Sequence, residues 1–317
     1  MKIVIVGPGA LGLLFYSLLR TGGNEVYLVD KDRQRAEFIS CNGINFITVS
    51  GKVKRIKHVN ITADPEDIPL PELIILTVKS YHTNSALKKI QPLLKENSYI
   101  LSVQNGLSHV EVMPKYVAPD RILLGITNQG ATRVDVNTVR HAGRGDTIIG
   151  TYLWDNFFRS HKFLRKLKTS FDKSGINTEI HRDIQSVIWS KLVINVGINA
   201  LTAITGYKNG RLVENPALRE IMHILVEEAL AVVNLKKIKL LYPDPQKKVE
   251  EVCQQTAENI SSMLQDILNN RRTEIDAING AVIKEGRKLG LNLPYNLCVY
   301  KIVKGLEKNI GSRIFRL

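Results

Sequence analysis

The sequence predicts an α/β chain of two domains, in which a doubly wound, mostly parallel sheet precedes an all-helical domain. Three observations lead to this prediction. The chain has 317 residues, more than one hydrophobic core usually organises. Apolar runs of strand length alternate with helical patterns up to residue 182, as in βαβ units. Beyond that point helical periodicity alone continues, so we expect domains at 1–182 and 183–317.

The first predicted strand and the loop after it indicate a dinucleotide site. Ile3 to Val6 form an apolar, β-branched run that suits a strand buried on both faces. Gly7, Gly9 and Gly12 follow in GxGxxG spacing, and the helical stretch Leu13 to Leu19 comes next. Such glycines allow a tight turn and close approach of backbone to a pyrophosphate, which the helix N-terminus faces. A merely structural glycine turn is the alternative. The predicted cofactor loop comprises Gly7, Pro8, Gly9, Ala10, Leu11 and Gly12.

The remaining elements of the first domain complete a Rossmann-type pattern. Strands are expected at Glu25 to Val29, Ile44 to Val49, Val53 to Ile61, Leu73 to Val78, Tyr99 to Val103, Ile122 to Thr127, Asn137 to His141, Thr147 to Gly150 and Thr178 to His181. Helices are expected at Arg33 to Cys41, Asn84 to Leu94 and Phe157 to Phe171. Ligands bind outside the carboxyl ends of parallel strands. Lys79 and Asn105 follow two such strands and are candidate ligands.

The helical half carries two groups of polar residues. Lys191, Asn195 and Asn199 are spaced i, i+4 and i+8, so they line one face of an otherwise apolar helix. A buried lysine there needs a carboxylate partner or a function, whereas a snorkelling surface lysine is the alternative. Asn259, Ser262 and Asp266 are expected to share a face of another helix, and Thr273 and Asp276 to cap the next one, which contains Glu274. This density of polar groups favours a lined cleft over plain polar helix surfaces.

Composition narrows the functional class. The chain has 44% hydrophobic and 23% charged residues, as ordinary globular proteins do. No run near the ~20 apolar residues of a membrane span and no targeting signal is evident. We therefore expect a cytoplasmic enzyme with no membrane partner. Cys41, Cys253 and Cys298 form no CxxC pattern and no histidines are in HxxxH spacing, so we predict no disulfide framework and no metal. The net charge is +14, but basic residues are scattered over several helical stretches. We therefore expect no nucleic-acid partner.

Several motifs together resemble one family. These are GPGALG, the strand ending TVKS, QNGL, KLVINVGINALTAITG, KNG, and ENISSMLQDI followed by RRTEIDAING. In identity, order and spacing, over nearly the whole chain, they are similar to the ketopantoate reductase (2-dehydropantoate 2-reductase) family. The last motif separates this family from other two-domain dehydrogenases. Ala200 replaces a proline that the family often has. The resemblance implies reduction of ketopantoate to pantoate with NADPH, for pantothenate and coenzyme A synthesis.

The resemblance also implies roles for the polar residues. Lys191 would be the general acid that protonates the ketone oxygen while the cofactor delivers hydride, and Glu274 would bind the substrate hydroxyl and orient Lys191. Lys79 and Asn105 would lie between cofactor and substrate. The residues implied to hold the keto acid are Asn105, Asn195, Asn199, Asn209, Asn259 and Ser262. An ammonium group that faces a developing alkoxide both stabilises its charge and supplies the proton, so these roles are chemically consistent.

The cofactor preference rests on conflicting signals. Asp30, at the end of the second strand, is the residue type that accepts the ribose 2′-hydroxyl of NADH and repels a 2′-phosphate. Lys31, Arg33 and Arg35 follow closely and favour a phosphate. We expect NADPH, while NADH stays open because of Asp30.

Two alternative functions stay open alongside ketopantoate reduction. The first is a reductase of another 2-keto acid on the same scaffold. The second is a non-catalytic protein that senses a dinucleotide or binds nucleic acid through its basic surface. The expected partner is a small keto acid, and a homodimer formed through the helical half is possible.

Overall fold

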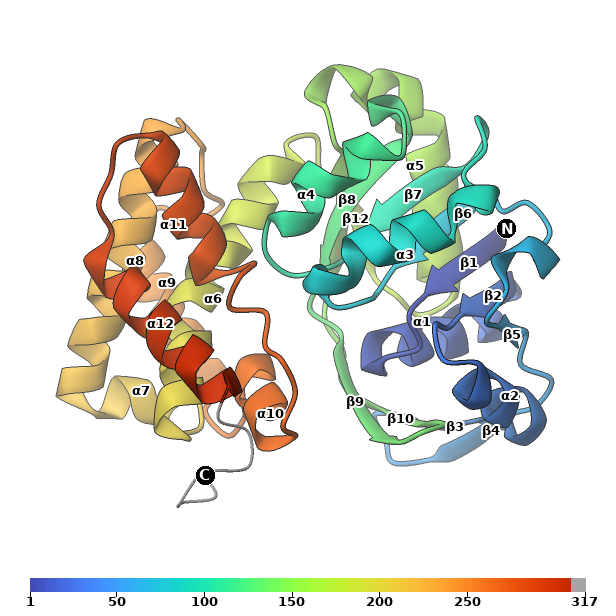
Figure 1. The fold of residues 1–317 in the computed structure, drawn as a ribbon, viewed down its shortest axis with the longest axis horizontal. Coiled ribbons are helices and arrows are strands. Elements are labelled where there is room, and N and C mark those ends of the chain that lie inside the picture. The colour runs from blue at the N-terminus through green and yellow to red at the C-terminus, as the bar shows by residue number, and fades with distance from the viewer. Residues whose placement is uncertain (309–317) are drawn as a thin grey trace. The chain divides into compact units, whose positions relative to one another are not determined.

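The computed structural model describes residues 1–308 and divides the chain into two compact units (Figure 1). The sheet unit comprises Met1–Gln104 and His109–Ile184, and the helical unit comprises Asn105–Ser108 and, of the described residues, 185–308. The second boundary lies two residues beyond position 182. The sequence does not predict that the short segment Asn105–Ser108 packs with the helical unit, because it directly follows a strand of the sheet unit.

The main sheet has eight strands, in the order β12-β11-β8-β7-β6-β1-β2-β5. Their bounds are β1 (Lys2–Val6), β2 (Glu25–Val29), β5 (Ile61–Thr62), β6 (Leu73–Leu76), β7 (Tyr99–Ser102), β8 (Ile122–Thr127), β11 (Thr147–Thr151) and β12 (Thr178–Ile180). The six neighbouring strands β8, β7, β6, β1, β2 and β5 are all parallel. β11 pairs with β8 in the antiparallel sense. β1 lies between β2 and β6, with Val6 aligned with Val29 and Leu76. The loop after β1 therefore lies at the switch point where such sheets bind ligands.

A second sheet of four strands stands apart from the first, in the order β4-β3-β10-β9. Its bounds are β3 (Ile44–Ile47), β4 (Val53–Ile56), β9 (Gly130–Asp135) and β10 (Thr138–Gly143). β9 was not predicted, because its sequence GATRVD lacks an apolar run. Helix α1 (Ala10–Thr21) contacts strands of both sheets, and this explains why Leu13, Leu14 and Phe15 are all fully buried.

Helices of different lengths follow the strands of the sheet unit, besides α1. The α-helices are α2 (Arg33–Asn42), α3 (Thr83–Lys89), α4 (Ser108–Val112) and α5 (Phe157–Lys173). Six 3₁₀ turns are also described: η1 (Pro65–Asp67), η2 (Ser80–His82), η3 (Gln91–Leu93), η4 (Met113–Lys115), η5 (Pro119–Arg121) and η6 (Trp154–Asn156). The predicted helix up to Leu94 ends at Lys89, since Pro92 cannot donate a helical hydrogen bond and forms part of η3 instead.

The helical unit is built around α6 (Ile184–Thr205), whose first residue still belongs to the sheet unit. Its other helices are α7 (Arg211–Glu214), α8 (Pro216–Leu235), α9 (Pro245–Gln255), α10 (Ser262–Leu268), α11 (Asn279–Lys288) and α12 (Pro294–Lys308). Trp189, Val193 and Val196 of α6 share one hydrophobic core with residues of α8 to α12. The predicted succession of helices is therefore confirmed.

Two expectations about this unit are wrong. Asn259 lies in the loop between α9 and α10, so it does not share a helical face with Ser262 and Asp266. Ser261 caps α10 instead, because its Oγ accepts a hydrogen bond from the N–H of Leu264 at 3.1 Å. Glu274 lies in a turn before α11 rather than within a helix, and the N-cap residue of α11 is Ile278, which has no capping side chain.

Helix α6 is by length and composition apolar enough to cross a membrane, contrary to the sequence expectation that no stretch approaches this limit. However, 78% of its most apolar window is buried inside the structure. That burial is the behaviour of a core helix, which passes the same test of length and composition.

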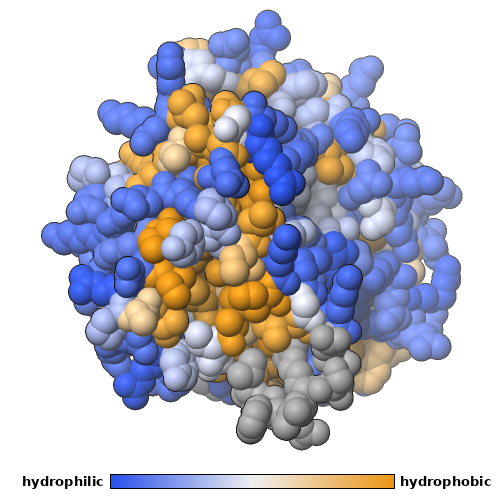
Figure 2. All heavy atoms as spheres, turned by 60° about the vertical axis from the view of Figure 1, so that its left-hand side comes forward, coloured by the Kyte–Doolittle hydropathy of each residue, from blue (hydrophilic) through white to orange (hydrophobic). Residues whose placement is uncertain are grey.

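The surface of the helical unit carries an apolar band. Figure 2 shows this band on the face that the view brings forward. The large apolar side chains exposed in this unit include Tyr207, Leu235, Leu241, Ile260, Leu268, Leu289, Tyr295 and Ile302. Contiguous exposed apolar surface of this kind is typical of a protein interaction site.

Gly12 provides a test of the contact between α1 and the loop that follows β1. A Cβ atom at this position would lie 2.1 Å from the carbonyl oxygen of Gly7 and 2.7 Å from Thr77 Oγ1. We expect Gly12→Ala to lower the free energy of unfolding by about 2 kcal/mol or more, because the backbone must move. Gly143→Ala is the control, since a Cβ there meets no described atom within 4 Å. Equal denaturation midpoints for the two variants would contradict the close packing.

Candidate active site

The loop after β1 presents open backbone at the start of α1. Gly7 has φ +100° and donates its N–H to the carbonyl oxygen of Val29 at 3.0 Å. Gly9 is the N-cap residue of α1, and a Cβ built on it meets nothing within 4 Å. The first turn of α1 holds no acidic residue. First-turn N–H groups lack helical partners, so this loop suits an anion such as a pyrophosphate.

The residues that follow β2 and β6 belong to the same unit. Asp30 is buried, and its carboxylate is bound by Arg35. Lys31 is exposed, with its Nζ 3.4 Å from Nε2 of His82. Lys79 is half-buried and is the N-cap residue of η2, three residues after the end of β6. Asp30 and Lys31 follow the carboxyl end of β2, and Lys79 follows that of β6. Both strands pair with β1, so these residues lie at the strand ends where the sequence predicted them.

Lys191, Asn195 and Asn199 occupy one face of α6, as their spacing predicted. Asn199 is buried, whereas Lys191 and Asn195 are half-buried. Burial lowers the pKa of Lys191 to about 8, and the negative charge of Glu274 acts in the opposite direction. The amine is therefore still mostly protonated at neutral pH, but it loses its proton at a lower pH than an ordinary lysine does.

Glu274 and Asn105 meet within the helical unit, although 169 positions separate them in the chain. Glu274 is buried, and its Oε2 accepts a hydrogen bond of 3.4 Å from Asn105 Nδ2. The N–H of Leu107 donates to the carbonyl oxygen of Ala277 at 3.1 Å. Gly106 has φ +78°, and a Cβ on it would lie 2.1 Å from that same oxygen. The loop Asn105–Ser108 is thus seated on the Glu274 turn.

Asn209 and Asn259 are also brought together. The N–H of Asn209 donates to the carbonyl oxygen of Asn259 at 3.1 Å, and Asn209 Nδ2 donates to Thr256 Oγ1 at 2.9 Å. Asn209 Oδ1 is buried and has no hydrogen-bond partner in the described part of the chain. Asn259 and Ser262 are exposed. A buried amide oxygen without a partner is suited to a donor from a bound molecule.

Sequence reasoning missed two contacts that hold these residues in place. Thr202 Oγ1 donates to Ser261 Oγ at 2.6 Å, and this joins the turn of α6 after Asn199 to the start of α10. Ser190, next to Lys191, accepts a hydrogen bond on its Oγ from the N–H of Leu241 at 2.9 Å. The Ser261 cap was readable as a serine before a helix, but its partner on α6 was not.

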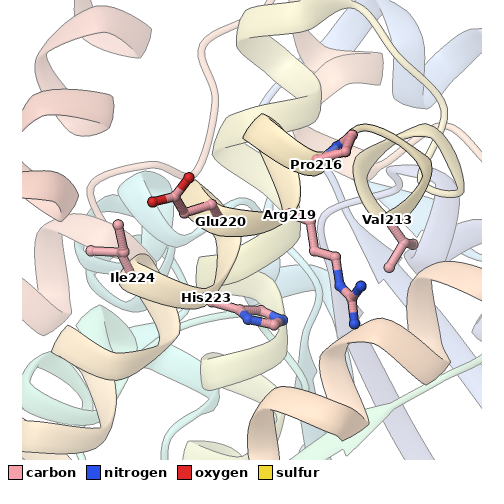
Figure 3. A pocket seen from close by; sticks show the side chains of 6 residues that line it. All are labelled: Val213, Pro216, Arg219, Glu220, His223 and Ile224. Atoms are coloured by element: carbon pink, nitrogen blue, oxygen red, sulfur yellow. The ribbon is translucent and has the colours of Figure 1, made fainter.

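A pocket of about 420 Å³ lies elsewhere in the helical unit, on α7 and α8 (Figure 3). Its lining consists of Val213, Pro216, Arg219, Glu220, His223 and Ile224. Arg219 Nε and His223 Nε2 both contact Glu250 Oε1, at 2.7 and 2.6 Å. The Glu250 carboxylate is thus bound by both side chains, and no residue predicted for substrate lines this pocket. Among residues 1–308, no group of three or more His, Cys, Asp or Glu side chains is arranged to hold a metal ion.

Gly106 provides a test of how the Asn105 loop is seated. We expect Gly106→Ala to lower the free energy of unfolding by about 2 kcal/mol or more, because the added Cβ clashes with Ala277 and the positive φ disfavours alanine. Asn105→Ala is the matched variant, since it removes the long hydrogen bond but keeps the glycine. Its effect is expected below about 1 kcal/mol. Urea denaturation measures the free energy of unfolding of both variants. A larger loss in Asn105→Ala than in Gly106→Ala would contradict this packing.

Comparison with known proteins identifies the family. The model described as "Ketopantoate reductase PanE/ApbA" matches residues 3–154, and "Ketopantoate reductase PanE/ApbA C terminal" matches residues 183–307. The 2-dehydropantoate 2-reductase of Pyrococcus horikoshii is 34% identical over 98% of this chain and 99% of its own length.

Two solved structures cover 98% of this chain and 99% of their own. The ternary structure of D-mandelate dehydrogenase with NADH and anilino(oxo)acetate has a TM-score of 0.91 at 28% identity. A PanE/ApbA family ketopantoate reductase from Ralstonia eutropha has a TM-score of 0.87 at 27% identity. With two family models that span most of its length and a relative above 30% identity, the chain belongs to the ketopantoate reductase family of oxidoreductases.

Proposed function

We propose that this chain reduces 2-dehydropantoate to pantoate with NADPH, for pantothenate and coenzyme A biosynthesis. The observation that carries the proposal is Lys191, an amine with a pKa of about 8 on the polar face of an apolar helix. The negative charge of Glu274 raises this pKa against the effect of burial. Such an amine is matched to proton donation near neutral pH. The family membership and the names of its relatives support the substrate.

The sheet unit supports binding of a nicotinamide dinucleotide. The open backbone at Gly9 and the start of α1 suit the pyrophosphate, and residues after β2 suit the adenosine end. A bound reduced nicotinamide supplies the hydride for the ketone carbon. The argument for the pyrophosphate rests on the open space beside Gly9, which the side chain of any other residue would occupy. Lys79 is the basic residue nearest in sequence to the end of β6 and contributes positive charge at this edge.

The helical unit supports proton donation and orientation of the keto acid. As the carbonyl carbon gains hydride, the ketone oxygen gains negative charge, and Lys191 transfers a proton from Nζ to that oxygen, so that an alcohol forms. Glu274 raises the pKa of Lys191, which keeps the ammonium form populated before the reaction. Asn195, Asn199, Asn209, Asn259, Ser262 and Asn105 hold the carboxylate and hydroxyl without neutralising the lysine.

A second candidate keeps the chemistry and changes the substrate. The structure with the TM-score of 0.91 is a D-mandelate dehydrogenase in complex with NADH and an aromatic oxo acid. Reduction of an aromatic 2-keto acid on this scaffold is therefore the specific alternative.

The deciding assay follows absorbance of the reduced nicotinamide in four reactions, with ketopantoate or benzoylformate and with NADPH or NADH. We expect the highest kcat/KM with ketopantoate and NADPH. Faster turnover of benzoylformate would favour the alternative substrate. Cofactor binding without turnover of either keto acid would overturn the reductase proposal and favour a dinucleotide sensor.

Lys191→Ala tests the general acid. We expect kcat to fall by about 10²- to 10⁴-fold, because proton donation to the developing alkoxide is lost. The Kd for NADPH is expected to stay within about twofold, since the residues assigned to the cofactor are unchanged. Lys288→Ala, which removes an exposed lysine that pairs with Glu285, is the control and is expected to keep normal turnover. Near-normal turnover by Lys191→Ala would remove Lys191 from this role.

The pH profile tests the charge coupling between Lys191 and Glu274. Reduction needs protonated Lys191, so kcat/KM is expected to be level below pH 8 and to fall as the pH rises through about 8. Glu274 raises this pKa, and Glu274→Gln is therefore expected to move the fall to lower pH. A fall at the same pH in both proteins would contradict the coupling.

A further inference from the structure

The carboxylate of Asp30 is already occupied in the sheet unit. Asp30 follows β2 directly and is 1% exposed. Arg35 Nε donates to Asp30 Oδ2 and Arg35 Nη2 donates to Asp30 Oδ1, both at 2.5 Å. The N–H of Asp32 donates to Oδ1 as well, at 3.1 Å. Each carboxylate oxygen therefore has a donor, and the two from Arg35 form a bidentate pair.

Arg35 is held in this position from both ends. Its N–H donates to Asp32 Oδ1 at 3.0 Å, where Asp32 is the N-cap residue of α2. Its guanidinium is bound by Asp30, and that hydrogen bond raises the pKa of Arg35. The side chain of Arg35 keeps 25% of its surface exposed, so it covers Asp30 from the solvent side. While Arg35 keeps this position, the Asp30 carboxylate is 1% exposed and both of its oxygens are bound, which disfavours a hydrogen bond from a ribose hydroxyl.

The other two basic residues of this segment stay accessible. Lys31 is exposed, and its Nζ lies 3.4 Å from His82 Nε2. Arg33 is 66% exposed and pairs with the exposed Asp64 at 2.7 Å. An exposed ion pair of this kind exchanges readily, because its net contribution is about 0–1 kcal/mol. These two cations can therefore turn to a phosphate, whereas Arg35 is bound to a buried partner.

We propose that Arg35 sets the cofactor preference of this chain by occupying Asp30, so that residue 30 cannot accept a ribose 2′-hydroxyl and Lys31 and Arg33 receive the 2′-phosphate of NADPH. Arg35 is in this view a specificity residue that acts through Asp30. The inference rests on the proposed use of a nicotinamide cofactor. The sequence predicted that Arg35 would be one of three cations near the phosphate. The inference instead assigns Arg35 to Asp30 and leaves the phosphate to Lys31 and Arg33.

The test is a double-mutant cycle on Arg35 and Asp30, read as binding rather than turnover. Calorimetric Kd values are measured for NADPH and NADH, and for 2′,5′-ADP and 5′-AMP, a pair that differs in the 2′-phosphate. The proteins are wild type, Arg35→Ala, Asp30→Asn, the double variant, and the control Arg55→Ala, which removes an exposed arginine of the same unit that bonds to a backbone carbonyl. Thermal unfolding of each protein verifies folding.

We expect the wild type to prefer NADPH and Arg35→Ala to shift the NADPH-to-NADH affinity ratio at least about tenfold toward NADH, since a free carboxylate then repels phosphate and accepts the hydroxyl. In the Asp30→Asn background the same change is expected to shift the ratio less than about threefold. Equal weakening of both cofactors by Arg35→Ala, an equal shift in both backgrounds, or a wild type that prefers NADH would each overturn the inference. Absence of binding of either cofactor to the wild type would overturn the proposed function as well, which separates the two failures.

Discussion

A lysine on an apolar core helix is the constraint on which the helical unit depends. α6 contributes Trp189, Val193 and Val196 to the core, and Lys191 lies among these residues on the same helix. Desolvation of an ammonium group is unfavourable unless a negative charge or hydrogen bonds compensate for it. Glu274 supplies that charge from a turn before α11, so the α10–α11 region must pack back toward α6. The same turn receives the Asn105 loop, and three segments distant in the chain are thereby joined.

The sheet unit keeps unpaired negative charge away from the strand ends around the start of α1. The start of α1 has backbone N–H groups and no acidic residue. The acidic residue that the unit does place at this edge, Asp30, is neutralised by a bidentate arginine. Glycine geometry makes the approach possible, since Gly7 adopts φ +100° and Gly12 lies against the Gly7 carbonyl. Backbone shape and charge pairing therefore act together.

Local patterns predicted the Rossmann-type sheet and the succession of helices, and they failed where packing overrides local preference. The alternation of apolar runs and helical periodicity located β1, β2, β6 to β8 and α6. It did not separate the four-stranded sheet from the main one, because strand partners are chosen by tertiary contact. It also placed Asn259 and Ser262 on one helix, because i, i+3 spacing suits a helical face and the capping preference of Ser261 was not weighed against it.

The sequence by itself determined the features that depend on near neighbours. The glycine spacing after β1 and the shared face of Lys191, Asn195 and Asn199 follow from turn and helix geometry over a few residues. The tertiary structure alone decided that Asn105–Ser108 packs with the helical unit. Residue spacing did not place Glu274 near Lys191 either; the family resemblance implied that pairing, and the structure gives the electrostatic interaction between them. It also decided that the guanidinium of Arg35 binds the buried carboxylate of Asp30. These outcomes depend on which surfaces are buried together and on which charges must then be paired, and residue spacing carries no information about either.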